Sequence, residues 1–284
     1  MNRGRAPTVS DRLASLKNAK AKTRRAYRAL ASLGLFVVFV AAWELTVRLL
    51  KIPDLLVPAP SSVAQALWAG LAVSPSSPLA LYWPMLQTLT EALGGLAIGA
   101  VIGLVLAMLM VQIRLIERYT MPYVMAFQSL PKIALAPLLI VWFGFGATST
   151  VVLVATSCFF PVLVNAVEGF KSTDPERLDL LRAMGASPSQ IFAMVVLPSA
   201  LPFIVSGLQI GLVISILSAI VGEFVNGRDG LGARILMANN VLDIATVFAV
   251  LIVLGAMGAM LDLSVRLLRR RILFWSPSER RVTI

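Results

Sequence analysis

Few residues of this chain could carry out acid-base, nucleophilic or metal chemistry. The 284 residues include no histidine and a single cysteine, Cys158, which lies within an apolar run. The lack of histidine removes the commonest general base and zinc ligand, together with every catalytic triad that relies on imidazole. One cysteine cannot form an intrachain disulfide, and we interpret it as a small packing residue. The composition therefore argues against a hydrolytic or metal-dependent enzyme.

The segment that most resembles a phosphate-binding loop is Gly169-Phe170-Lys171-Ser172-Thr173. A phosphate-cradling loop of the form G-x-x-x-x-G-K-[ST] needs a glycine directly before the lysine and a second glycine upstream. Here Phe170 separates the glycine from the lysine, and the upstream glycine is missing. We expect no cofactor on this chain, so any ATP and Mg²⁺ chemistry would belong to a separate polypeptide.

Five polar side chains occur within otherwise apolar runs, where they are costly unless they face protein or water. Lys132 is the most informative, because it lies between Pro131 and Pro137, where a broken helix could present a cation to an anionic solute. The alternative is that Lys132 snorkels to the membrane boundary or pairs with a carboxylate such as Glu91. The full set of predicted pathway residues is Lys132, Gln128, Asn165, Gln209 and Glu91.

These side chains must be positioned by membrane helices. The chain is 58% hydrophobic with a mean hydropathy of +0.85, far above that of a soluble domain. A span needs roughly 20 mostly apolar residues. We therefore predict an all-α membrane protein with a basic arm at 1–29, a transmembrane domain at 30–268 and a basic tail at 269–284. The six predicted spans are about 30–50, 85–111, 121–143, 148–167, 191–222 and 244–265.

Small residues and prolines give these spans further detail. Glycines at 95, 99 and 103, and small residues at 207, 211, 215 and 219, form two stripes that we interpret as helix-packing faces. Because Pro198 and Pro202 come early in the fifth apolar run, we expect its membrane helix to begin near Phe203. The stretch 223–243 is predicted to be a polar loop.

The basic residues set the orientation, because short loops rich in Lys and Arg stay in the cytoplasm. With six spans and an internal N-terminus, 20 of the 25 basic residues fall on the inner side and 4 on the outer side. The net charge of +11 therefore reports topology, not nucleic-acid binding. The prediction is a multi-pass protein of the plasma (inner) membrane with both termini in the cytoplasm and with the loop 168–190 on the same side.

The cytoplasmic loop carries two helix-start signals separated by a glycine. Thr173 or Asp174 is a cap followed by Pro175, and Ser187-Pro188-Ser189-Gln190 fits a capping box. Gly185 between them marks a helix end, so two helices are expected to meet at a sharp corner. Such a corner would act as a lever for a cytoplasmic partner, although an ordinary polar loop with local caps would give the same signals.

The loop also resembles a known family. Asp179-Leu-Leu-Arg-Ala-Met-Gly185-Ala-Ser, followed by Phe192, Leu197-Pro198, Pro202 and Gly207, is similar to the EAA loop of binding-protein-dependent ABC importer permeases. The segment from Gln128 to Gly146, and Glu223 followed by Gly230-Leu231-Gly232, resemble the nitrate, sulfonate, taurine and thiamine-precursor subgroup. The opening triplet departs from Glu-Ala-Ala, because a shorter acid is kept and the small residues are enlarged.

The resemblance implies the type I importer fold and a set of partners. These are a dimer of ABC ATPase subunits, a solute-binding protein, a second permease copy as a homodimer, and the lipid bilayer. Residues 174–187 would form the helix that docks on the ATPase, and the solute would be a sulfonate, taurine, nitrate or a pyrimidine or thiamine precursor. The ATPase-coupling residues implied are Asp174, Glu176, Asp179, Arg182, Ala183, Gly185, Ala186, Ser187, Leu197 and Pro198.

Two other classes of protein remain as alternatives. An ion-coupled secondary transporter would need an intramembrane carboxylate relay and usually internal repeats, but Glu91 is the only acid we place in mid-span and no repeat is evident. A membrane-embedded enzyme would need paired carboxylates or a nucleophile with its base, which the apolar runs do not supply.

Overall fold

The computed structural model describes residues 9–74, 76–77 and 79–273. Every regular element in these ranges is helical. Two compact units, residues 1–65 and 66–284, are described separately below. Five helices are long and apolar enough to cross a membrane, and a sixth crossing results if one bent helix pair is counted as a span.

The first unit contains α1 (Val9–Leu49) and the first residues of α2 (Pro60–Leu71). The apolar part of α1 is Leu30–Leu49, and the basic segment predicted as an arm is helical from Val9. Glu44 lies in the last two turns of this apolar part, where its carboxylate pairs with Arg48 Nε at 2.5 Å. The backbone N–H of Ser61 donates to the other Glu44 oxygen at 3.0 Å, so one acidic side chain joins the end of α1 to the start of α2.

The second unit is built around α6 (Ala147–Lys171), with α3 (Tyr82–Gln112) and α9 (Leu197–Asn226) packed along it. The glycine stripes make this packing possible. A side chain at Gly99 would collide with the Ala155 carbonyl of α6, and one at Gly207 would lie 3.1 Å from the Pro161 carbonyl. Cys158 is fully buried at this junction, as expected of a packing residue. The stripes are therefore packing faces.

The third predicted span, 121–143, is not one straight helix. The chain forms α4 (Arg114–Gln128), a 3₁₀ turn at Lys132–Leu135 and α5 (Ala136–Phe143), with an 86° bend between the two halves. Pro131 lacks the N–H that would continue the ladder, which explains why α4 stops before it. Whether this bent pair crosses the whole bilayer stays a prediction.

Two further expectations are wrong in detail. The helix predicted to begin near Phe203 instead begins at Leu197, with Pro198 in its first turn and a π-helical segment at Phe192–Val196 before it. The Leu197 N–H closes the π turn on the Phe192 carbonyl, so the turn is complete before Pro198, which has no N–H to donate. The polar stretch predicted as a loop contains the end of α9 and a further helix, α10 (Leu231–Asn240).

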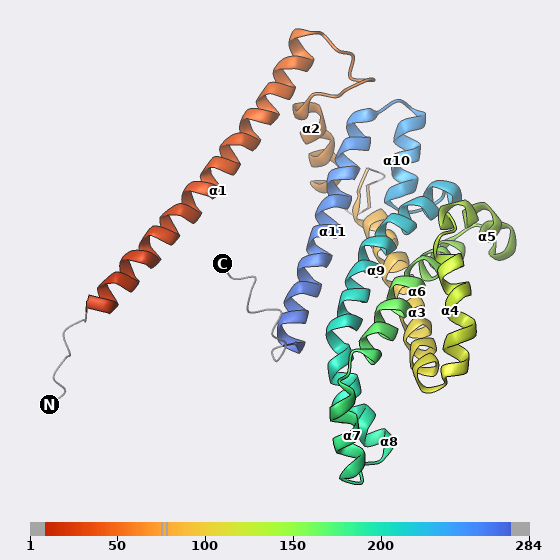
Figure 1. Ribbon diagram of the computed structural model, residues 1–284. Coiled ribbons are helices and arrows are strands. Elements are labelled where there is room, and N and C mark those ends of the chain that lie inside the picture. The colour runs from red at the N-terminus through yellow and green to blue at the C-terminus, as the bar shows by residue number, and fades with distance from the viewer. Residues whose placement is uncertain (1–8, 75, 78, 274–284) are drawn as a thin grey trace. The chain divides into compact units, whose positions relative to one another are not determined.

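The ends of the second unit differ in character (Figure 1). The short helices α7 (Pro175–Ala183) and α8 (Pro188–Ile191) project at one end, where α11 (Ile244–Ile272) also finishes. Helices α5 and α10 lie at the opposite end. We call the end with α7 and α8 the corner end. The opposite end, where the chain turns from α9 into α10, is the hairpin end.

Candidate functional site: the corner and the hairpin end

The α7–α8 corner is formed by two side-chain helix caps and a glycine with positive φ. The Asp174 side chain caps α7 by accepting the Glu176 N–H at 3.0 Å, which confirms one of the two predicted caps. Ser187 and Gln190 form the predicted capping box at the start of α8. Gly185 has φ of +79°, a left-handed conformation that favours glycine.

The turn between the helices has a defined hydrogen-bond pattern. The Ala186 N–H donates to the Leu181 carbonyl and the Gly185 N–H to the Arg182 carbonyl, both at 3.0 Å. These two bonds make a Schellman motif, which fixes the direction in which the chain leaves α7. The corner is thus a defined turn and not a loose connection.

The corner exposes almost all of its side chains. None of the residues of α7 is buried, and Leu180 and Met184 are 62% and 75% exposed. Asp179 and Arg182 pair with each other at 2.9 Å on the same exposed helix. Charged residues around uncovered apolar ones are the usual make-up of a docking surface.

The corner is held firmly where it joins the membrane helices. Lys171 at the end of α6 forms an ion pair with Glu117 of α4, and the rings of Phe170 and Phe192 lie 5.7 Å apart. A side chain at Gly169 would come within 2.9 Å of the Ala200 carbonyl, so α6 and α9 touch backbone to backbone there. Leu197 and Pro198, both half-buried, begin α9 directly after the π segment.

The predicted pathway residues do not come together as one site. Lys132 Nζ donates to the Gln128 carbonyl at 3.1 Å and lies 5.0 Å from the centre of the Phe160 ring, so the suggested pair with Glu91 does not form. Asn165 donates to the Pro161 carbonyl of its own helix at 2.8 Å. Lys132 and Gln128 are thus neighbours, and Asn165 bonds within α6.

Gln209 has a partner that the sequence reasoning missed. Its Nε2 donates to Asp262 Oδ1 at 2.8 Å, and Arg266 pairs with the other Asp262 oxygen at 2.7 Å. This network joins α9 to α11. The sequence held one sign of this network. Asp262 comes four residues before Arg266, a spacing that places both side chains on one helix face.

At the hairpin end, three side chains hold the backbone of other segments. Glu223 Oε2 accepts the Gly232 N–H at 2.6 Å, and Thr88 Oγ1 accepts the Leu231 N–H at 2.9 Å. Asn226 Oδ1 accepts the Gly146 N–H at 2.9 Å. A side chain at Gly230, which has φ of +98°, would overlap the Glu223 carboxylate. The Glu223 and Gly230-Leu231-Gly232 pattern is therefore one packed unit.

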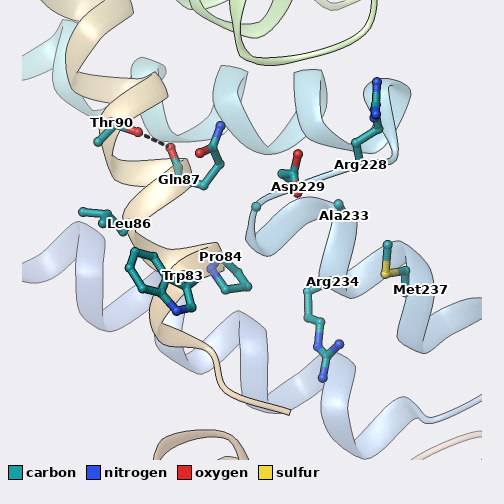
Figure 2. Close-up of a pocket in the computed structure, with 11 residues that line it drawn as sticks. Trp83, Pro84, Leu86, Gln87, Thr90, Arg228, Asp229, Ala233, Arg234 and Met237 are labelled. Atoms are coloured by element: carbon teal, nitrogen blue, oxygen red, sulfur yellow. Dashed lines mark hydrogen bonds between the residues drawn. The ribbon is translucent and has the colours of Figure 1, made fainter. Parts of the chain in front are cut away.

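Beside this unit lies a cavity of about 420 Å³ (Figure 2). Residues of α3, of the turn after α9 and of α10 line it, including Trp83, Gln87, Asp229 and Arg234. The Arg228 and Arg234 side chains extend in opposite directions away from Asp229 (Figure 2). Nothing in the sequence indicated this cavity, because it forms from two segments, 83–90 and 228–237, that are distant in the chain.

Comparisons with known proteins show which family and which relatives this chain matches. Residues 99–274 match the model of the binding-protein-dependent transport system inner membrane component. The riboflavin transport system permease protein of Chloroflexus aurantiacus is 35% identical over 87% of this chain and 89% of that protein. The formylaminopyrimidine transport permease protein of Halalkalibacterium halodurans is 32% identical over 90% of this chain and its own whole length.

Solved structures agree on the fold. A chain of the inward-facing MetNI methionine ABC transporter superposes with a TM-score of 0.55 at 21% identity, covering 76% of this chain and 98% of that chain. A chain of an amino acid ABC transporter gives a TM-score of 0.54 at 19% identity, covering 66% of this chain and 92% of that chain. The type I fold expected from the sequence is confirmed.

Proposed function

Because the chain belongs to the family of binding-protein-dependent transport system inner membrane components, we propose that the α7–α8 corner is where an ATPase subunit drives it. The chain is a multi-pass permease subunit of an ABC importer, a class that works with ATPase and solute-binding partners. The observation that carries the proposal is an exposed corner that continues at both ends into the packed helices α6 and α9.

The proposed contact with the ATPase uses the residues already singled out in the loop. Leu180 and Met184 supply the apolar centre, because their exposed surface would be removed from water. The Asp179–Arg182 pair would lie at the rim, where charges guide association more than they add affinity. Asp174, Gly185 and Ser187 hold the shape of the corner. Of the other coupling residues, Ala183 and Ala186 belong to the corner itself, Glu176 lies in the first turn of α7, and Leu197 and Pro198 start α9.

The complex is proposed to contain two copies of this chain, a homodimer, with ATP hydrolysed entirely by the partner subunits. The chain itself would act without catalysis. The excess of basic residues supports an orientation with both termini and the corner in the cytoplasm. That orientation requires the bent pair α4–α5 to cross the membrane.

The solute is proposed to be a small organic molecule or anion of the kind that the relatives carry. Their names include riboflavin, formylaminopyrimidine, aliphatic sulfonates and taurine. We propose that Lys132 and Gln128 lie on the pathway, because they flank the break between α4 and α5. There they offer a cation beside a backbone carbonyl group. Asn165, Gln209 and Glu91 are kept as secondary pathway positions, since they lie on α6, α9 and α3, outside the break between α4 and α5.

A double variant tests the docking surface. Leu180→Asp with Met184→Asp places two charges where burial is required, and burying one such apolar side chain is worth about 1.5–3 kcal/mol. We expect the ATPase subunit to be lost from the purified complex and uptake into proteoliposomes to stop. Leu56→Asp is the matched control, because Leu56 is 69% exposed but lies outside the corner. A double variant that retains the ATPase and imports normally would refute the proposal.

A further inference from the structure

Three buried oxygen atoms at the hairpin end lack hydrogen-bond partners. They are Glu91 Oε2, Thr150 Oγ1 and Glu223 Oε1, on α3, α6 and α9. The three residues are 3%, 1% and 1% exposed. Unpartnered polar atoms are rare in such positions, so each needs an explanation.

The remaining carboxylate oxygens are already engaged. Gln87 Nε2 donates to Glu91 Oε1 at 2.6 Å, and the Gly232 N–H donates to Glu223 Oε2 at 2.6 Å. Each carboxyl group is therefore fixed on one side by a short bond. Each has one oxygen left without a donor.

The three residues lie close to one another. Thr88, one turn before Glu91 on α3, accepts the Leu231 N–H, and Glu223 accepts the next N–H along the chain, that of Gly232. A side chain at Gly222, the neighbour of Glu223, would come within 2.8 Å of the Thr150 methyl group. Glu91, Glu223 and Thr150 therefore lie at one junction of α3, α9 and α6.

No cation balances these two acids among the described residues. Neither takes part in an ion pair, and the other charged group that acts on both is the acidic Asp229. The nearby Arg228 and Arg234 extend away from Asp229 (Figure 2). Two unbalanced carboxylates in a buried place are strongly unfavourable, because neither water nor a counter-charge stabilises them.

From these contacts we infer that Glu91, Glu223 and Thr150 form a proton-binding site, in which the two carboxyl groups hold one proton between them. A protonated carboxyl group becomes a donor, and the Thr150 hydroxyl supplies a second hydrogen. Two hydrogens are enough to bring all three unpartnered oxygens into hydrogen bonds. One negative charge then remains, stabilised by the Gly232 N–H at the start of α10. The inference does not rest on the proposed role of the corner.

Infrared difference spectroscopy of the purified chain tests the site, because a protonated carboxyl group has a carbonyl band distinct from that of a carboxylate and sensitive to exchange into D₂O. We expect wild type at neutral pH to show such a band, and Glu91→Gln or Glu223→Gln to lose it. Glutamine keeps the shape of the neutral acid, so both variants should fold with near wild-type thermal midpoints.

Asp262→Asn is the matched control. Asp262 also lies in a membrane helix but pairs with Arg266, so its replacement should leave the band unchanged. The inference is overturned if wild type shows no protonated-carboxyl band. It is equally overturned if the band persists in both glutamine variants, or if Asp262→Asn removes it.

Discussion

Replacement of Gly185 by valine tests whether the shape of the corner matters, apart from its surface chemistry. Gly185 has φ of +79°, and a side chain built there would meet no atom within 4 Å. The cost of valine is therefore backbone strain alone, about 1–2 kcal/mol for an L-residue in the left-handed region. That strain lowers the ratio of native to non-native corner by about 5- to 30-fold.

The assay is ATP-dependent uptake into proteoliposomes that contain the ATPase and the binding protein. We expect Gly185→Val to reduce uptake, by up to the same factor, while the protein still inserts and purifies. Gly185→Asn should retain most activity, because asparagine tolerates the left-handed conformation.

Gly227 provides a matched control for the valine substitution. It has φ of +67° in the left-handed region and nothing within 4 Å of an added Cβ atom, but it ends α9 at the hairpin end. Gly227→Val should therefore carry a similar strain without a comparable loss of uptake. Normal transport by Gly185→Val, or equal losses in the two valine variants, would refute the lever model.

Three further predictions concern packing, capping and the pathway. Gly99→Leu should prevent close approach of α3 and α6 and lower the thermal midpoint in detergent, whereas Gly94→Leu, with nothing within 4 Å, should not. Ser187→Ala should cost about 1 kcal/mol by removing the cap of α8, measurable as reduced uptake with unchanged insertion. Lys132→Ala should reduce uptake of an anionic solute and spare a neutral analogue; an equal loss of both would point to misfolding. Each variant is compared with its control, or with wild type where no control is named, under identical conditions.

Local signals in the sequence were sufficient for the corner. A cap, a proline and a glycine act within a few residues, so their order was enough to assign Gly185 and Ser187 and to narrow the cap of α7 to Thr173 or Asp174. The stripe that includes Gly99 was likewise readable, because helical spacing puts such residues on one face.

Features that depend on distant segments were not predictable. The partner of Gln209 is 53 residues away in the chain, and Thr88 holds the N–H of a residue 143 positions later. The stretch predicted as a loop at 223–243 is polar because its side chains satisfy buried backbone groups, as Glu223 does for Gly232. Polarity alone does not distinguish an exposed loop from such a junction.

The arrangement of α9 suggests how a force at the corner reaches the other end of the unit. Its 30 residues extend about 45 Å at 1.5 Å per residue, from Leu197 beside the corner to Asn226 at the hairpin end. Close backbone contacts along α6 oppose sliding between the two helices, so they are expected to move together. The π segment at 192–196 is the one place along this path where the regular ladder is widened, and it lies next to the corner. A displacement of the corner is therefore expected to flex this joint first and then to carry α9, with the groups held by Glu223 and Asn226, as one body.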